Sequence, residues 1–396
     1  MKSRLVLSAD TKRNLAAACL AFACNKVFVI ILSAIGVSQW YAGKSFLGKV
    51  RLVLVGNFLH WDATQYTAIS KSGYQTVKAT AFFPGYPLAI RTVSWVTHMS
   101  ALTAGVLISN ILFLLFLYFF IKLALLDYDW AQSRRALLLL AFYPMAYYFS
   151  GAYTESMFML VSVLALLAMR RQQWSRAGVW GMIAAVTRNT GVLLGLPYLI
   201  EYYSKWRQSG SGSRRVKFWP VLWVVMIGIG VAAYMGYLWA AKGDPLSFIH
   251  QQKNYGRGTG TPWGTLYRGY RYGFDYLIHP RLGWTYVYYV TEMFFPALVI
   301  VVLITSFRKI RWSYWVMILY SLIVPLFGPA NAAPDVHSTV IDYFVSFSRY
   351  SLVIVPLYFG LARLLRNRWA FRVYLALSII FLMIFTFAWS RHAWVA

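Results

Sequence analysis

Apolar stretches near the length of a membrane-crossing helix dominate this chain of 396 residues. A helix needs about 20 mostly apolar residues to cross the hydrocarbon core of a bilayer. We place eleven spans at residues 15–38, 101–122, 136–152, 156–170, 175–188, 190–204, 218–241, 285–307, 313–328, 350–364 and 372–390. Hydrophobic residues make up 60% of the chain and charged residues only 12%, against about 25% charged in soluble domains. This composition excludes a water-soluble globular protein and predicts an all-α polytopic membrane protein.

The charges predict an orientation for the spans. Lys and Arg number 38 against 11 Asp and Glu, a net charge of +27. Nearly all short loops on one side of the layout are basic, which is typical of cytoplasmic loops. We therefore expect a cytoplasmic N-terminus and an extracytoplasmic C-terminus after eleven spans. Because the sequence shows no retention signal or soluble extension, we expect residence in a prokaryotic cell (inner) membrane rather than in the endoplasmic reticulum. Because loops facing the cytoplasm explain the positive charge, we expect the lipid bilayer as a partner and no nucleic acid.

Two outer segments, residues 39–100 and 242–284, are too long for simple turns, and loops of this length are usually functional. The first contains an amphipathic stretch over 46–59 and a helix candidate over 86–98, which we expect to lie in the membrane interface. The second is rich in Gly and Tyr over 254–273, where we expect an irregular loop. No internal repeat or soluble domain is visible, so residues 1–396 are predicted to form one transmembrane domain.

The eleven acidic residues can be sorted by whether the predicted layout places them on the inner side, on the outer side or within a span. A carboxylate at membrane depth costs about 3 kcal/mol, so such a residue is a functional candidate. Asp62 is the sharpest candidate, because it follows the amphipathic stretch in His60-Trp61-Asp62, where neighbouring aromatics would partly desolvate a base. The alternative is that Asp62 caps an interfacial helix. The acids on the inner side are predicted to be solvated surface; they are Asp10, Asp127, Asp129 and Glu201. The other acids lie on the outer side or, for Glu292, inside the eighth span; they are Glu155, Asp244, Asp275, Glu292, Asp335 and Asp342.

A set of short motifs resembles the PIG-V-type GPI mannosyltransferase 2 family and its bacterial relatives, in glycosyltransferase family 76 of the GT-C superfamily. The resemblance covers roughly residues 55–365 and is specific as an ordered set. The motifs are His60-Trp61-Asp62, the stretches 69–74 and 81–88, Tyr153-Thr154-Glu155-Ser156, the stretches 187–191, 243–248 and 251–263, and Ser348-Arg349-Tyr350.

The resemblance implies a GT-C-type bundle of about 11 transmembrane helices, with interfacial helices in the first outer loop and an extracytoplasmic active site. It implies transfer of a sugar, typically mannose, from a polyprenyl-phosphate carrier to a lipid or glycan hydroxyl with inversion. The family's base is an acid of the first outer loop, and the position that matches it is Asp62. Within the matching motifs we expect substrate contacts from Trp61, Tyr86, Glu155, Arg188, Asn189, Gln251 and Arg349.

The predicted layout independently places Asp62, Glu155, Arg188 and Arg349 near the outer face. Arginine holds phosphate bidentately, so two arginines beside a base would suit a lipid-phosphate donor. We expect one in-line displacement, with Asp62 taking the acceptor's proton and the arginines stabilising the leaving phosphate. We expect no metal and no cofactor; Glu155 would orient a sugar hydroxyl or pair with an arginine. Arg188 taken alone is equally typical of a side chain that snorkels to the interface.

Two other functions fit parts of the sequence. One is a transferase of a different sugar, such as a modified pentose, to a lipid headgroup. The other is a non-enzymatic lipid or sugar transporter, which would place charges at mid-bilayer depth. Lys26 and Glu292 lie inside predicted spans and form either a buried pair or part of a carrier-lipid groove.

Overall fold

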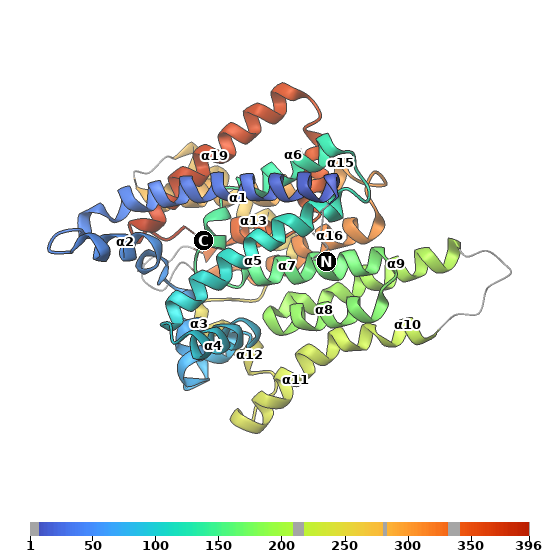
Figure 1. Ribbon diagram of the computed structural model, residues 1–396, viewed down its shortest axis with the longest axis horizontal. Helices are drawn as coiled ribbons and strands as arrows, with labels where there is room; N and C mark the ends of the chain where they lie inside the picture. The colour runs from blue at the N-terminus through green and yellow to red at the C-terminus, as the bar shows by residue number, and fades with distance from the viewer. Residues whose placement is uncertain (1–7, 209–217, 280–282, 332–340, 396) are drawn as a thin grey trace, which may run out of the picture.

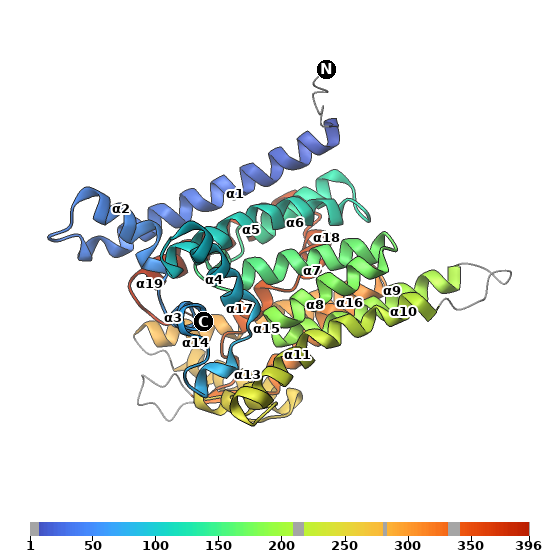
Figure 2. The ribbon, with the colours of Figure 1, turned by 60° about the horizontal axis from the view of Figure 1, so that its bottom comes forward.

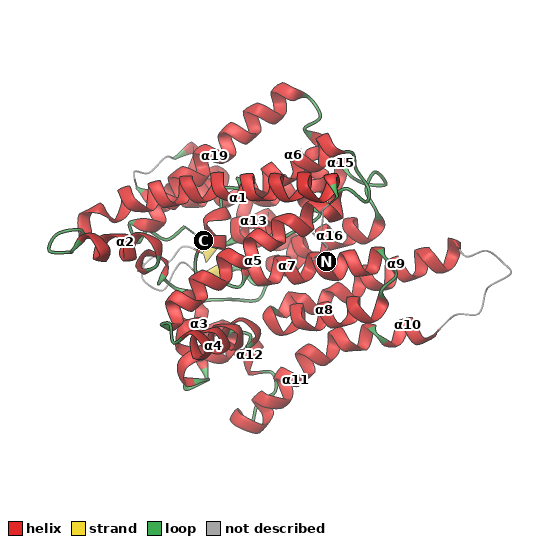
Figure 3. Ribbon diagram, in the orientation of Figure 1, coloured by secondary structure: helices red, strands yellow, loops and turns green. Residues whose placement is uncertain are grey.

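The computed structural model describes residues 8–208, 218–279, 283–331 and 341–395. In this part of the chain the regular secondary structure is helical apart from one short antiparallel strand pair, β1 (Ala330–Asn331) and β2 (Ile341–Asp342), and loops and turns join the helices (Figure 3). The main helices of the bundle are α1 (Ala9–Gly36), α5 (Ala101–Ala124), α6 (Trp130–Ala141), α7 (Glu155–Arg170), α8 (Trp174–Thr187), α9 (Gly195–Gln208), α11 (Val224–Lys242), α15 (Phe294–Thr305), α16 (Trp312–Leu326), α18 (Leu357–Leu364) and α19 (Arg368–Ser390). The prediction of an all-α membrane protein is confirmed.

Every predicted span contains one of these helices, but they differ in length. Among the described residues, five segments are long and apolar enough to cross a membrane by themselves; they are Ala9–Trp40, Ala101–Ala124, Trp219–Lys242, Tyr286–Thr305 and Arg368–Ser390. The other predicted spans hold shorter helices, so a total of eleven crossings stays a prediction. Three short helices precede longer ones; they are α10 (Phe218–Leu222), α14 (Trp284–Glu292) and α17 (Phe347–Leu352).

Proline explains two of the shortened spans. The predicted span 136–152 contains α6 only as far as Ala141, because Pro144 has no amide hydrogen to continue the helix. The chain continues through the 3-10 turn η4 (Ala146–Ser150), and every residue over 141–156 is buried. Pro356 likewise separates α17 from α18. Such non-helical backbone is tolerated at membrane depth where protein surrounds it.

The bundle is built on α7, which packs against α5 on one side and α8 on the other, while α8 packs against α11 (Figures 1 and 2). Helix α1 lies against α5 and α19, so the two ends of the chain's helical region meet. Small residues bring α8 and α11 close together: a Cβ added at Gly230 would lie 2.6 Å from the carbonyl oxygen of Met182. Close backbone approach through small residues is the usual way helices associate in lipid, where no hydrophobic force drives them together.

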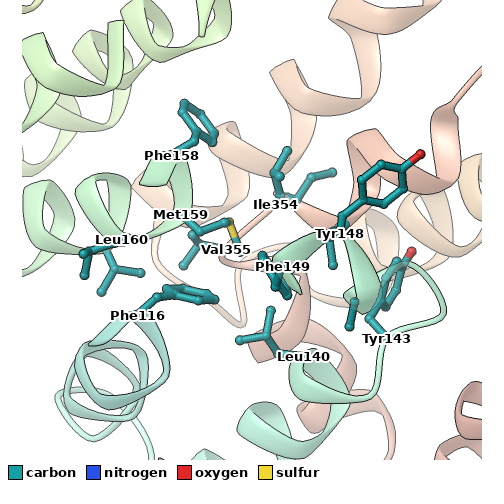
Figure 4. Packing of buried hydrophobic residues seen from close by; sticks show 14 of the residues in the cluster. Phe116, Leu140, Tyr143, Tyr148, Phe149, Phe158, Met159, Leu160, Ile354 and Val355 are labelled. Atoms are coloured by element: carbon teal, nitrogen blue, oxygen red, sulfur yellow. The ribbon is translucent and has the colours of Figure 1, made fainter. Parts of the chain in front are cut away.

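Aromatic and aliphatic side chains from separate elements fill the centre of the bundle (Figure 4). Phe113 of α5 stacks on Phe149 of η4 with ring centroids 4.5 Å apart, and Phe116 lies 5.9 Å from the same ring. Tyr148, beside Phe149, belongs to this core and also borders the cavity described below. The buried segment 141–156 therefore connects the core to the candidate site.

The two long outer segments contain more helix than predicted. The first holds α2 (Phe46–Leu54) and α4 (Gly85–Thr97), as expected, and also α3 (Asp62–Ser72). Its 3-10 turns are η1 (Val37–Trp40), η2 (Gly56–Phe58) and η3 (Lys78–Ala81). Helices α2 and α4 expose large apolar side chains, including Phe46 and Trp95. This exposure suits a membrane interface, which stays a prediction for both helices.

The prediction of an irregular loop over 254–273 holds for residues 256–261 and is wrong for the rest. Residues 262–273 belong to the 17-residue helix α13 (Pro262–Ile278), and the 3-10 turn η7 (Gln251–Tyr255) and the short helix α12 (Ser247–His250) lie just before the loop that leads to it. Thr261 caps α13, and Pro262 begins it with a backbone angle already suited to a helix. Gly269 and Gly273 lie one turn apart and admit Phe344 and Met293 against the backbone, so the glycines serve packing rather than irregularity.

The prediction that Asp127 and Glu201 are solvated is also wrong. Glu201 is 2% exposed, and Arg311 donates two hydrogen bonds of 2.9 Å to its carboxylate. Asp127 is ion-paired with Arg170 and accepts a hydrogen bond from Tyr314. We call Asp127, Arg170, Glu201 and Arg311 the second charge network. Two carboxylates and two guanidinium groups balance there, which makes burial of the charges tolerable. Asp10 and Asp129 are exposed as expected.

Two glycines on the same helix test the packing of α8 against α11. Gly230→Ala places a methyl group against Met182, whereas Gly228 has open space around it. Overpacking costs about 1–3 kcal/mol, while Ala is the better helix former at both positions. We expect Gly230→Ala to lower the Tm of the detergent-solubilised protein by a few degrees and Gly228→Ala to leave it unchanged or raise it. Equal Tm values for the two variants would contradict this interface.

Candidate active site

A cavity of about 410 Å³ opens where α3, the end of α8, η7, the start of α17 and the C-terminal tail meet. Its wall is half polar and strongly aromatic, which suits a ligand with both a polar and an apolar part. Five charged side chains border it: Asp62, Lys78, Arg188, Arg257 and Arg349. The aromatic residues on its wall are Trp61, Tyr66, Phe82, Phe83, Tyr148, Tyr153, Tyr255, Tyr350 and Trp394.

One wall carries a continuous chain of ion pairs, which we call the site network: Asp62, Arg349, Glu155 and Arg188. Arg349 donates from Nη1 to Asp62 Oδ2 at 2.5 Å and from Nε to Glu155 Oε1 at 2.7 Å. Arg188 donates from Nη1 to the same oxygen of Glu155 at 2.9 Å. The structure thus brings together four residues that lie in four separate stretches of the sequence. Two negative and two positive charges balance within the network.

Asp62 is the first residue of α3, and its carboxylate does not cap the helix. The preceding Trp61 adopts φ +43°, a strained conformation for a bulky residue that persists only where the surroundings hold it. The Trp61 ring is packed against Trp389 and Trp394, with centroids 4.6 and 5.4 Å away. Burial and the nearby His392 lower the pKa of His60 to about 4, so His60 adds no positive charge beside Asp62 at neutral pH. The Asp62 side chain keeps 30% exposure, toward the cavity.

Glu155 lies beneath the cavity wall at the first residue of α7 and is fully buried. Burial alone would raise the pKa of Glu155, but the charges of Arg349 and Arg188 outweigh it and hold the pKa below its usual value. Glu155 therefore stays ionised. Of the two roles predicted for it, the structure shows the pairing with arginine, and Glu155 joins both arginines rather than one.

Arg349 is held by its own helix and by the rings beneath it. Its guanidinium lies 4.6 Å from the ring centroid of Tyr148 and 5.0 Å from that of Tyr153, a cation–π arrangement. Helix α17 starts at Phe347, after Ser346 in a left-handed conformation with φ +57°. Residues preceding both Asp62 and Arg349 thus adopt uncommon backbone conformations, which often occur at functional sites.

Two side chains of α14 fix the segment that leads to Arg349. Glu292 is 1% exposed and accepts hydrogen bonds from the backbone amide of Ser348, at 2.9 Å, and from its hydroxyl. One turn earlier, the Tyr288 hydroxyl accepts from the Ser346 amide and donates to Asp342. Glu292 therefore satisfies amide and hydroxyl groups at the start of the helix that carries Arg349. Lys26, its possible partner, donates instead to Ser150 at 2.5 Å, so the two form no pair.

The remaining predicted site residues divide into two groups. Trp61 and Asn189 border the cavity. Tyr86 does not border it: its side chain is fully buried, and its hydroxyl is bonded to Gly105 and Ser109. Gln251 accepts from Asn254 outside the cavity, and its neighbour Gln252 lies on the wall instead. Asp335 lies outside the described residues.

Sequence reasoning missed Lys78, Arg257, Tyr350 and Trp394 on the cavity wall, whereas Tyr255 was a possible sugar contact of the long outer loop. Arg257 and Tyr255 fall within the motif stretch 251–263, but loop charges and interfacial aromatics have the same appearance in a sequence. Trp394 reaches the cavity because the chain turns back after α19, where its carbonyl accepts from Trp284. Among the described residues, no cluster of three or more His, Cys, Asp or Glu side chains forms a metal site.

The sequence profile of the mannosyltransferase (PIG-V) family matches residues 14–227, more than half of the chain. The human GPI alpha-1,6-mannosyltransferase 2 is 30% identical over 162 residues, 38% of this chain and 32% of the relative. GPI mannosyltransferase 2 of Drosophila pseudoobscura pseudoobscura is 25% identical over 201 residues, 47% of this chain and 44% of the relative. The matched regions thus cover less than half of either relative. On the profile match, which includes Asp62, Glu155 and Arg188, the chain belongs to the mannosyltransferase (PIG-V) family.

Proposed function

We propose that this protein is an integral-membrane glycosyltransferase that transfers mannose from a polyprenyl-phosphate donor to a hydroxyl group of a lipid or glycan, with inversion. The observation that carries the proposal is the Asp62–Arg349 ion pair on the wall of an open cavity, in a chain of a mannosyltransferase family. The pair offers a base and a cation side by side, as transfer from a phosphate leaving group requires.

The reaction we propose is a single in-line displacement. The acceptor oxygen attacks the anomeric carbon from the face opposite the phosphate, and its proton passes to the Asp62 carboxylate. The bond between the anomeric carbon and the phosphate oxygen breaks, and its electron pair leaves with the polyprenyl phosphate. One carboxylate suffices because a phosphate leaves without protonation, unlike the leaving group in glycoside hydrolysis.

The site network suits this charge movement. Before the reaction, Asp62 neutralises part of the charge of Arg349 at 2.5 Å. When Asp62 takes the proton it becomes neutral, and the guanidinium is then free to stabilise the negative charge that develops on the leaving phosphate. Stabilisation that increases toward the transition state accelerates the reaction, whereas equal binding of substrate and transition state does not. Arg188 borders the same cavity and, with Glu155, holds Arg349 in position.

We further propose that the reaction needs no divalent cation. Among the described residues, Asp62 is the single carboxylate on the cavity wall, and Glu155 beneath it already binds two arginines. A hard cation prefers several oxygen ligands, which this arrangement does not offer. Transfer is therefore expected to continue in EDTA.

The proposed location is a prokaryotic cell membrane, with the cavity on the extracytoplasmic side, the N-terminus in the cytoplasm and the C-terminus outside. The basic short loops support this orientation through the positive-inside rule. A donor phosphate at headgroup depth would also suit a cavity at one end of the helix bundle.

Asp62→Asn tests the proposed base. The amide cannot take a proton, and general-base catalysis contributes roughly 10²–10⁴-fold. Turnover of labelled polyprenyl-phosphate mannose by the purified protein should fall by about that factor, while donor binding is retained. Asp275→Asn is the matched control, because Asp275 is an exposed acid of the second outer segment that lies outside the family motifs and off the cavity wall. Near-wild-type transfer by Asp62→Asn would refute the assignment.

Glu292 tests how Arg349 is placed. In Glu292→Ala the amide and hydroxyl of Ser348 lose their acceptor, so Arg349 shifts; small misplacements of a catalytic group cost up to about 10²-fold in rate. We expect kcat to fall about tenfold or more with little change in the donor KM. Glu292→Gln should recover part of the rate, because its side-chain carbonyl still accepts from the Ser348 amide. An alanine variant with unchanged kcat would show that Glu292 does not position Arg349.

A further inference from the structure

Two cations of the cavity stand apart from the site network. Lys78 begins η3 and is exposed, with Nζ 4.7 Å from the ring centroid of Tyr255. Arg257 follows η7 and donates to the carbonyl of Gly328 at 3.1 Å and to the hydroxyl of Tyr350 at 2.6 Å. Both side chains border the same cavity as Asp62.

Neither cation is bound to a carboxylate within the part of the chain that the structure describes. Asp342 interacts electrostatically with Arg257, but its oxygens accept hydrogen bonds from the Tyr288 hydroxyl and the Phe344 amide. In the site network, by contrast, each arginine has a carboxylate partner within 3 Å. The accessible positive charge of the cavity is therefore concentrated on Lys78 and Arg257.

We propose that Lys78 and Arg257 form an anion-binding pair that holds the phosphate of the polyprenyl-phosphate donor before the reaction begins. This inference rests on the proposed function and adds a division of roles to it. The unpaired cations bind the phosphodiester in the ground state. Arg349 acts later, once proton transfer to Asp62 releases its charge.

The contacts of the pair prepare it for this role. Arginine has five N–H donors, and the two bonds of Arg257 to Gly328 and Tyr350 leave others for a ligand. Those two bonds also fix the guanidinium, so less conformational entropy is lost on binding. Tyr255 lines the same cavity as the pair and Asp62, and Lys78 packs on its ring.

The test measures binding without catalysis. Wild type, Lys78→Gln, Arg257→Gln and the double variant are titrated with a C15 prenyl phosphate and with the corresponding prenyl alcohol, followed by tryptophan fluorescence. Loss of a hydrogen bond to a charged group weakens binding by about ten- to a hundredfold. We expect about that loss of prenyl phosphate affinity in each single variant, more in the double variant, and unchanged affinity for the alcohol. Lys253→Gln and Arg268→Gln are matched controls, because both residues are exposed and lie away from the cavity wall.

Unchanged prenyl phosphate affinity in the double variant would overturn the inference, even if Asp62→Asn had abolished transfer. If the variants lose affinity but the wild type transfers no sugar from any mannose donor, the anion site stands and the proposed function fails. A competition experiment with phosphatidic acid tests whether the site prefers the donor lipid to other phospholipids. Displacement of prenyl phosphate by an equal concentration of phosphatidic acid would show a general phospholipid headgroup site and overturn the assignment to the donor.

Discussion

The bridging of two carboxylates by Arg349 is the interaction on which the candidate site depends. Arg349 joins Asp62 and Glu155, which lie 287 and 194 positions away in the chain. Its side chain is 12% exposed and that of Glu155 is fully buried. Buried charges are tolerated only when they are paired, and removal of one partner leaves a costly charge behind. The network therefore fixes α3, α7 and α17 around one cavity while leaving part of Asp62 open to a ligand.

Helix α7 connects this network to the second charge network. Glu155 is its first residue and Arg170 its last, and at 1.5 Å per residue they lie about 22 Å apart along the helix axis. This distance is shorter than the hydrocarbon thickness of about 30 Å. Charges thus gather at both ends of α7, while Phe158 and Met159 between them belong to the same apolar core as Phe149 of η4 (Figure 4). Such a distribution suits a helix whose two ends lie near opposite surfaces of a bilayer.

The long apolar runs were enough to predict the main helices of the bundle, though not α3 or α13. Because acids are few, Asp62 and Glu155 could be considered individually. The predicted order of the spans was enough to place all four residues of the site network near the same membrane face, because successive spans cross the membrane in opposite directions. What the sequence could not reveal depends on packing. In the sequence, Gly269 and Gly273 are typical of a loop; only the structure shows that Phe344 and Met293 pack against them. Glu201 looks solvated until Arg311, 110 residues away, covers it.

A double-mutant cycle on Asp62 and Arg349 tests the central claim most directly. The measurement is the turnover of labelled polyprenyl-phosphate mannose by Asp62→Asn, Arg349→Gln and the double variant. Residues that act as one unit have strongly non-additive effects on the rate. If proton transfer to Asp62 releases the charge of Arg349, the double variant should be little slower than the slower single variant. Rate losses that multiply would show that the two side chains act independently and would contradict the account.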